Sequence, residues 1–320
     1  MTGPIRLGTR GSSLALWQTE RVRQLLVQSH PDLRCEIVVI TTTGDRVLDT
    51  PLPVIGGKGV FTVELEQALR EGLIDFAVHS LKDLPTETAL GLAIGAILER
   101  ADPADVLVSR NGHTIRSLHR HARVGTSSSR RAAQLLSVRS DLEVLDLRGN
   151  VDTRLRKAMD PSGPYDAIVM ARAALERLGQ MGVISEVILH DTMLPAPGQG
   201  ALAVQCRDQA EGLKLLDGLR HRPTELETVA ERAFLEGLGG GCAVPVAALA
   251  HWCEEGSLEI KGRVLSLDGA LRVDVEAKEW ITGSGEARAV AYDVGARLAA
   301  EALSRGAAEL LAGAKGDAAS

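Results

Sequence analysis

The feature that most constrains the fold of this chain is a regular alternation of short apolar runs with segments of helical period. The apolar runs predict strands at residues 5–8, 34–41, 74–79, 92–98, 105–109, 123–126, 143–147, 166–170 and 201–205. The segments between them predict helices at residues 14–28, 62–71, 130–138, 152–157 and 171–178. Strands that alternate with helices in this way indicate an α/β architecture.

From residue 219 onward the pattern changes, and we expect a smaller α+β domain over residues 219–320. Helical spacing of apolar residues predicts a helix at 225–238, and an apolar run predicts a strand at 243–250. The dipeptide Asp268-Gly269 is suited to a tight type I′ turn. It predicts a hairpin of residues 257–267 and 270–281, followed by one long Ala-rich helix at 286–311.

Two breaks in the pattern predict how the first part of the chain divides. One is the polar, proline-marked segment Glu99-Arg100-Ala101-Asp102-Pro103, and the other is the proline- and glycine-rich segment 194–200. Two such breaks suggest that the chain crosses twice between two lobes. We therefore expect a first lobe of residues 1–99 and 196–218 and a second lobe of residues 100–195.

Composition and charge exclude several classes of protein. An apolar content of 45% over 320 residues can fill the cores of several domains, and a net charge of −6 argues against a nucleic-acid partner. No amino-terminal targeting pattern and no apolar run of membrane-spanning length stand in the sequence, so we expect a cytoplasmic protein without a membrane partner. Four cysteines exclude a disulfide framework. A monomer is expected.

Three predicted strand-to-helix turns share one chemistry, namely residues 9–13, 125–131 and 148–150. Each offers hydroxyl or backbone N–H groups at a helix start, where anions are favoured, and each adds arginine, which matches a carboxylate with two hydrogen bonds. In a single turn, N-cap serines and surface arginines would be the ordinary explanation. Three together predict a cleft for a ligand with several carboxylates or phosphates. The segment 56–59 supplies no Walker-type loop, which disfavours phosphate.

Two further residues stand where chemistry could occur. Asp83 lies in His79-Ser80-Leu81-Lys82-Asp83-Leu84-Pro85, directly after a predicted strand, at the end where open α/β sheets bind ligands. Alone it could simply cap the next turn. Cys242 ends Gly239-Gly240-Gly241-Cys242, where glycines let other groups approach, although free cysteines are commonly buried. Without a Cys-x-x-Cys pair or a second histidine at ligand spacing, no metal site is predicted.

Several segments together resemble hydroxymethylbilane synthase, the family also called porphobilinogen deaminase, in that family's order and over nearly the whole chain. They are residues 79–85, Gly125-Thr126-Ser127-Ser128-Ser129-Arg130-Arg131, Leu147-Arg148-Gly149-Asn150-Val151, Pro197-Gly198-Gln199-Gly200 and Gly240-Gly241-Cys242. The sequence departs from the pattern at Ser129, where an apolar residue is expected, and in a more apolar segment after Cys242.

The resemblance implies two lobes like the halves of a periplasmic solute-binding protein, with mixed sheets and an active site between them. Members join four porphobilinogen molecules head to tail, release ammonia each time and hydrolyse off the linear tetrapyrrole hydroxymethylbilane. By matched position, Cys242 would hold a dipyrromethane cofactor through a thioether bond, and Asp83 would stabilise a cationic pyrrole and move protons. The matched residues for binding cofactor and substrate are Arg10, Ser12, Lys82, Thr126, Ser127, Ser128, Arg130, Arg131, Arg148, Arg154 and Arg177.

Two other functions remain open at this point. A two-lobed protein that binds a polycarboxylate without catalysis would explain the arginines and the double crossing, but it leaves Asp83 and Cys242 without a role. A cysteine hydrolase could pair Cys242 with His79 or His251, yet no recognisable Cys-His-Asn arrangement supports it.

Overall fold

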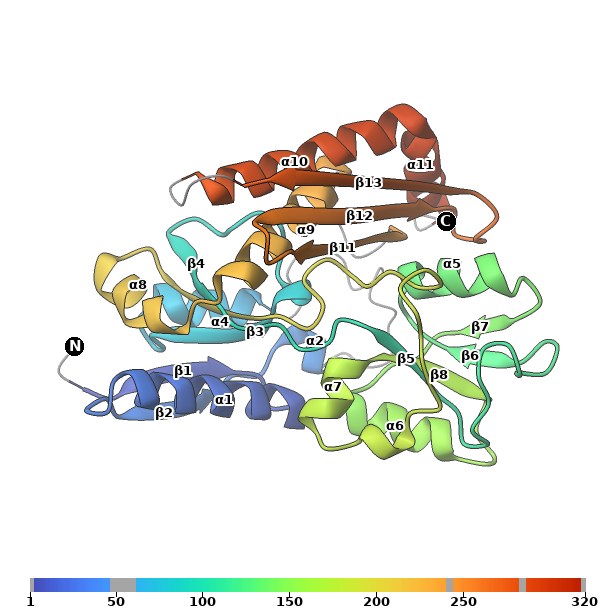
Figure 1. The fold of residues 1–320 in the computed structure, drawn as a ribbon. Helices are drawn as coiled ribbons and strands as arrows, with labels where there is room; N and C mark the ends of the chain where they lie inside the picture. The colour runs from blue at the N-terminus through green and yellow to red at the C-terminus, as the bar shows by residue number, and fades with distance from the viewer. Residues whose placement is uncertain (1–2, 47–61, 240–243, 282–285, 318–320) are drawn as a thin grey trace.

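The computed structural model describes residues 3–46, 62–239, 244–281 and 286–317 (Figure 1). They form three bodies, each with its own sheet. The first two bodies are α/β lobes with mixed sheets, and the third is a smaller α+β domain, so the predicted fold class is confirmed. Within these residues no helix is both long and apolar enough to cross a membrane.

The first lobe is built on a five-stranded sheet in the order β2-β1-β3-β10-β4. Its strands are β1 (Ile5–Thr9), β2 (Cys35–Val39), β3 (Phe76–Ser80), β4 (Leu92–Ile97) and β10 (Leu202–Arg207). β1 pairs in parallel with β2 and β3, whereas β10 is antiparallel to β3 and β4. Its helices are α1 (Ser13–Ser29), α2 (Thr43–Arg46), α4 (Val63–Arg70) and α8 (Ala210–Leu216).

The alternation of side chains along β3 explains why helices cover both faces of this sheet. Phe76 and Val78 pack with Val22 of α1 in one apolar cluster. Ala77, between them, packs with Leu65 of α4 in another. Because β1 and β3 are parallel, their carboxyl ends meet at the same edge of the sheet.

The second lobe repeats this plan with the strand order β7-β6-β8-β5-β9. Its strands are β5 (Asp105–Val108), β6 (Arg123–Gly125), β7 (Glu143–Leu145), β8 (Ala167–Ala171) and β9 (Glu186–Val187). β6 is parallel to β7 and β8, and β5 is antiparallel to β8 and β9. Its helices are α5 (Ser129–Val138), α6 (Val151–Met159) and α7 (Arg172–Arg177).

The third body is an antiparallel sheet in the order β11-β12-β13, with helices packed on one face (Figure 1). Its elements are α9 (Arg222–Gly237), β11 (Val246–Trp252), β12 (Ser257–Leu265), β13 (Arg272–Trp280), α10 (Ala287–Ala302) and α11 (Ala308–Asp317). α9 and α10 approach so closely that any side chain at Gly295 would overlap the carbonyl oxygen of Ala230. Phe234 of α9 is fully buried in the core beneath them.

The chain passes between the first two sheets twice, through residues 98–104 and residues 188–201. The two crossings lie against each other, because the backbone N–H of Ala101 donates to the carbonyl oxygen of Gly200 at 3.2 Å. Gly200 has a φ of +88°, and a Cβ there would overlap Ala101. The lobe boundaries given from the sequence stay a prediction.

Every strand predicted before residue 206 is present, with each end within about two residues of the prediction. The short β9 and the helix α8 were not predicted. The single helix expected at 286–311 is wrong: α10 ends at Ala302, and Gly306, with a φ of 98°, interrupts the path to α11. A left-handed residue cannot continue a right-handed helix.

The type I′ turn predicted at Asp268-Gly269 is also wrong. That turn needs a positive φ at both central residues. Gly269 has a φ of +70°, but His121 is the only non-glycine residue with a positive φ in the part of the chain that is described. A longer connection forms instead, in which the carboxylate of Asp268 accepts hydrogen bonds from the Ser266 hydroxyl and the Ala270 N–H.

Candidate active site

A hollow of about 420 Å³, which includes space open to solvent, lies where β1 and β3 end. It is lined by Arg10, Ser12, Leu14, Ala15, Gln18, Thr62, Val78, His79, Ser80 and Asp83. The predicted site residues Arg10, Ser12 and Asp83 therefore lie together. Ser12 is the N-cap of α1, and its hydroxyl accepts a hydrogen bond from the N–H of Ala15 at 3.3 Å.

The backbone around Asp83 is held firmly although its side chain is exposed. Leu81–Asp83 form a short 3₁₀ helix, and Leu81 and Leu84 on either side are buried. The N–H of Leu81 donates to the carbonyl oxygen of Ala201 at 3.0 Å, and that of Leu84 donates to the carbonyl oxygen of Leu81 at 3.1 Å. The carboxylate thus stands on a fixed turn at the rim of the hollow.

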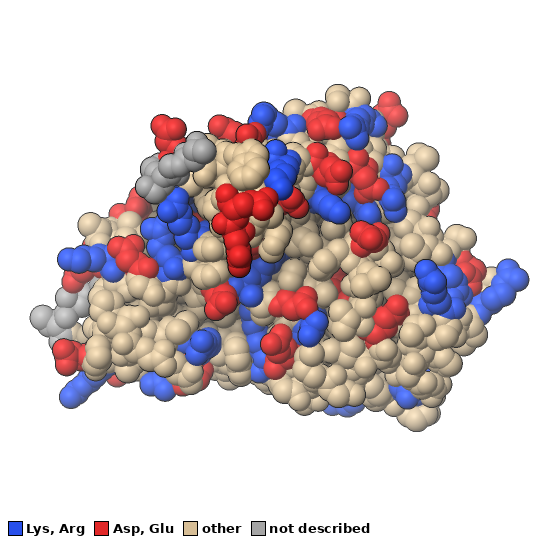
Figure 2. Space-filling model, in the orientation of Figure 1, with Lys and Arg blue, Asp and Glu red and all other residues tan. Residues whose placement is uncertain are grey.

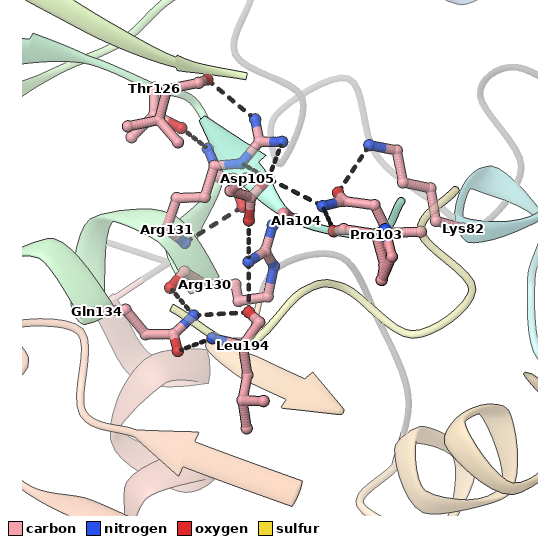
Figure 3. Close-up of polar contacts among 12 residues, drawn as sticks. Lys82, Pro103, Ala104, Asp105, Thr126, Arg130, Arg131, Gln134 and Leu194 are labelled. Atoms are coloured by element: carbon pink, nitrogen blue, oxygen red, sulfur yellow. Dashed lines mark hydrogen bonds and ion pairs between the residues drawn. The ribbon is translucent and has the colours of Figure 1, made fainter. Parts of the chain in front are cut away.

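Beside Asp83, the ammonium group of Lys82 turns toward the second lobe. Its Nζ donates to Oε1 of Gln199 at 3.1 Å (Figure 3). Burial lowers the pKa of Lys82 to about 8, and the charges of Arg131 and Arg130 add to this effect while Asp83 and Asp105 oppose it. Lys82 therefore lies within electrostatic reach of the arginine-bearing turn at 125–131.

Asp105, at the start of β5, is the centre of a buried network that links the two lobes. Its carboxylate accepts from Arg130 Nη1 at 2.7 Å and from Arg131 Nη2 and Nε at 2.7 and 3.1 Å. Gln199 Nε2 donates to it at 2.9 Å (Figure 3). Burial opposes ionisation of Asp105, but the two arginines outweigh it and hold the pKa of this carboxyl well below its usual range.

The hydroxyl groups in the turn at 125–131, which were predicted to contact a ligand, form hydrogen bonds within the protein. Ser128 is the N-cap of α5 and accepts from the N–H of Arg131 at 3.4 Å. The Ser127 hydroxyl donates to the carbonyl oxygen of Leu147 at 2.7 Å and accepts from its N–H at 3.0 Å. Thr126 Oγ1 accepts from the N–H of Ser128. The ordinary capping role thus accounts for these contacts, and their role toward a ligand stays a prediction.

Arg148 and Arg154, two more of the predicted binding residues, lie at or near the start of α6. Asn150 caps this helix, because its side chain accepts a hydrogen bond from the N–H of Thr153. Arg154 Nε donates to the carbonyl oxygen of Gly149 at 2.8 Å. Burial lowers the pKa of Arg154 to about 10; the charges of Arg131 and Arg148 lower it further, and Asp83 opposes them. Arg154 of the second lobe therefore lies within electrostatic reach of the Asp83 carboxylate in the first lobe.

Arg177 of α7 lies at the junction of the lobes. Its Nη2 donates to the carbonyl oxygen of Gly200 at 2.6 Å, and its guanidinium lies 5.9 Å from the ring centroid of Trp17 in α1. Burial lowers its pKa to about 10. A second contact between the lobes, at 3.0 Å, joins the Ser13 hydroxyl to a carboxylate oxygen of Asp152.

Basic side chains are visible in the furrow between the lobes in Figure 2. This arrangement places several cations around one exposed carboxylate, so it suits a ligand that carries several carboxylates. Cys242 lies outside the described residues. The sequence reasoning missed Asp105 and Gln199 as parts of the site; an acidic residue at the head of an otherwise apolar strand was the signal for Asp105.

Fold and site together define a two-lobed α/β protein that gathers cations around a carboxylate between its lobes. The family model "Porphobilinogen deaminase, dipyromethane cofactor binding domain" matches residues 5–214, and "Porphobilinogen deaminase, C-terminal domain" matches residues 225–304. The chain belongs to the porphobilinogen deaminase family.

Relatives named porphobilinogen deaminase match over almost their whole length. The protein from Syntrophomonas wolfei is 48% identical over 309 residues, which cover 96% of this chain and 97% of the relative. The protein from Roseiflexus sp. (strain RS-1) is 48% identical over 311 residues, covering 96% and 98%. The solved periplasmic aliphatic sulphonate binding protein SsuA from Escherichia coli shows a TM-score of 0.35 at 15% identity, over 76% of each chain.

Proposed function

We propose that this protein is a hydroxymethylbilane synthase, a transferase that polymerises four porphobilinogen units, releases ammonia and hydrolyses off the linear tetrapyrrole. The observation that carries the proposal is Asp83 at the rim of a hollow, within electrostatic reach of the cations Lys82 and Arg154. Family membership along nearly the whole chain supports the same activity.

The cofactor of this family domain is a dipyrromethane. The site fits such a group, because the charges of Arg131 and Arg148 lower the pKa of Arg154 and a ligand rich in carboxylates would relieve that repulsion. When bound, the cofactor supplies a primer with a free pyrrole carbon. Residues that would hold it and the substrate through carboxylate contacts are Arg10, Lys82, Arg130, Arg131, Arg148, Arg154 and Arg177, with Ser12, Thr126, Ser127 and Ser128 as further polar contacts.

Asp83 supplies the acid–base chemistry in this proposal. As ammonia leaves porphobilinogen, positive charge develops on the substrate pyrrole, and a fixed carboxylate beside it lowers the energy of that state. The same carboxylate then accepts the proton that a terminal pyrrole releases when it regains its aromaticity. Its firmly held turn supports both tasks, because neither requires the backbone to reorganise.

Lys82 has a binding role. Its side chain is half-buried and donates a hydrogen bond to Gln199. With a pKa of about 8, its ammonium group is charged below that pH and can pair with a carboxylate of the ligand. A cytoplasmic location and a monomeric state belong to this proposal as well. The free thiols of Cys35, Cys206 and Cys253 fit a reducing compartment.

The mass of the intact protein tests the proposal. Purified protein should exceed its sequence mass by two linked pyrrole units, and Cys242→Ser should lack the excess. Cys253→Ser is the matched control, since Cys253 is a free, half-buried thiol eleven residues further along the chain, and it should keep the adduct. Active protein with the bare sequence mass would overturn the cofactor assignment. A polycarboxylate-binding protein without catalysis predicts no adduct and no release of ammonia.

A further inference from the structure

The loop that follows Asp83 is held by an arginine from the third body of the molecule. Arg232 lies in α9, and its guanidinium donates to three successive carbonyl oxygens. Nη1 donates to Leu84 at 3.1 Å, and Nη2 donates to Pro85 at 2.6 Å and to Thr86 at 3.2 Å. These carbonyl groups begin one residue after Asp83. A guanidinium has five N–H donors in a rigid fork, so it can hold several acceptors at once.

Arg232 lies in an environment that makes these contacts its main hydrogen bonds. Burial lowers its pKa to about 10, with Glu236 opposing this effect and Arg288 adding to it. Across the chain described here, no carboxylate lies within ion-pair distance of Arg232. A half-buried cation whose N–H groups are satisfied by the carbonyl groups of one loop fixes that loop against its own helix.

The neighbouring residue in α9 holds the crossings between the lobes. The buried carboxylate of Glu231 accepts from Arg100 Nη1 at 2.6 Å and from the N–H of Gly198 at 2.6 Å. It also accepts from the N–H of Ala250 in β11 at 2.8 Å. Two consecutive residues of α9 therefore bind different parts of the site: Arg232 binds the loop after Asp83, and Glu231 binds the junction of the lobes. In the sequence, that helix leads to Cys242.

We propose that Arg232 is a positioning residue for Asp83, which fixes the height and orientation of the carboxylate relative to the helix that precedes the cofactor cysteine. The inference rests on the role proposed above for Asp83. The inner side of the loop is held separately, by the buried cluster of Leu81, Leu84 and Ala201. Loss of Arg232 should therefore loosen the carboxylate without unfolding the lobe.

A double-mutant cycle tests this proposal. Arg232→Met removes the N–H donors and keeps an unbranched chain, and Arg232→Lys keeps one cationic group. Arg297→Met is the matched control, because Arg297 is an exposed arginine of the same body and pairs with Glu279. For each folded, cofactor-loaded variant, kcat and KM for ammonia release are measured in the wild-type and the Asp83→Asn backgrounds.

Arg232→Met should lower kcat about 10- to 100-fold with little change in KM, because a displacement of about 1 Å at a reacting group can cost 10²-fold. In the Asp83→Asn background the same substitution should change kcat less than about twofold. Arg232→Lys should recover part of the loss, and Arg297→Met should match wild type. Equal losses of kcat in both backgrounds, or no loss, would overturn the proposal.

The outcomes also separate this inference from the proposed function. If Asp83→Asn turned over like wild type, both would fall. If Asp83→Asn were impaired but Arg232→Met acted additively, only the positioning role would fall. Amide hydrogen exchange of residues 84–90 should be faster in Arg232→Met than in wild type, and unchanged exchange would overturn the proposal. Should Arg232→Met not fold, Arg232→Gln and Arg232→Lys carry the same cycle.

Discussion

The arginine-bearing turns of the two lobes look alike in the sequence and differ in the structure. Each follows a parallel strand and begins a helix with a serine N-cap. In the first lobe, Arg10 and Ser12 line an open hollow with Asp83. In the second, Arg130 and Arg131 are only 5% and 6% exposed and are bonded to Asp105.

The difference comes from the neighbouring strands. β5 enters the second sheet beside β8 and carries Asp105 to a point opposite the helix start, where it receives both guanidinium groups. In the first lobe, β3 carries His79, whose pKa burial lowers to about 4, so the imidazole stays neutral. A local motif therefore marks a helix start, and a carboxylate on another strand of the sheet gives the arginines of the second lobe an internal partner as well.

The largest effect on activity is expected from a substitution of Asp83. Asp83→Asn keeps the shape of the side chain but removes its charge and its proton transfer, so ammonia release should fall about 10²–10⁴-fold. Because the side chain is exposed at the rim, the melting temperature should stay within a few degrees of wild type. Asp83→Glu should retain more activity than Asp83→Asn. Near-wild-type turnover of the Asn variant would remove Asp83 from the mechanism.

Asp105→Asn should have the opposite effect to Asp83→Asn, because its main effect should be a loss of protein stability. It leaves two buried arginines without their counter-charge, and breaking a buried ion pair costs about 3–5 kcal/mol. Urea unfolding measures the loss. Asp102→Asn is the matched control, because its pair with Arg172 is partly exposed and should contribute less than about 1 kcal/mol. Equal stability of the two variants would contradict the internal role of Asp105.

Arg10→Leu and Arg131→Leu sharpen the comparison between the turns. Each removes charge-assisted hydrogen bonds of about 1.5–3 kcal/mol, but from different partners. Arg10→Leu should impair cofactor assembly or chain elongation. Arg131→Leu should also lower the free energy of unfolding, because Asp105 loses a partner. Native mass spectrometry of enzyme-bound intermediates and urea titrations check both, and the same profile for both variants would contradict the distinction.

The smallest expected effect is a dependence of stability on pH through His79. Its pKa is about 4 in the folded protein and near 6.5 in an unfolded chain. The unfolded state takes up this proton first, so stability should fall as the pH drops from about 6.5 toward 4 and be unaffected above. At pH 5 the loss is about 2 kcal/mol. His79→Gln should flatten the curve between pH 7 and pH 5, and parallel curves would rule out this linkage.

The sequence predicted the parts of the fold that depend on local periodicity. Strands β1 to β8 and the helix starts at Ser12 and Ser128 follow from apolar spacing and capping residues. The network from Lys82 through Gln199 to Asp105 joins residues about a hundred positions apart, so no local pattern could reveal it. The break at Gly306 was hidden because alanine-rich flanks favour a continuous helix.

For Asp83 and the arginines, the sequence predicted that they would meet between the lobes but not which contacts they would make. The distinction between Arg10 and Arg131 needed the position of Asp105 on β5, which β8 separates from β6 in the sheet.

The joined crossings at Ala101 and Gly200 limit how the lobes can move. Two linkers joined by this hydrogen bond should move together and serve as one hinge between the lobes. We therefore expect the lobes to open by rotation about this junction rather than by sliding past each other. Opening the furrow would therefore swing Arg131, Arg148 and Arg154 away from Asp83 together, as one rigid set. A growing oligomer would meet a binding surface that retreats as a unit, with the spacing between its cations preserved.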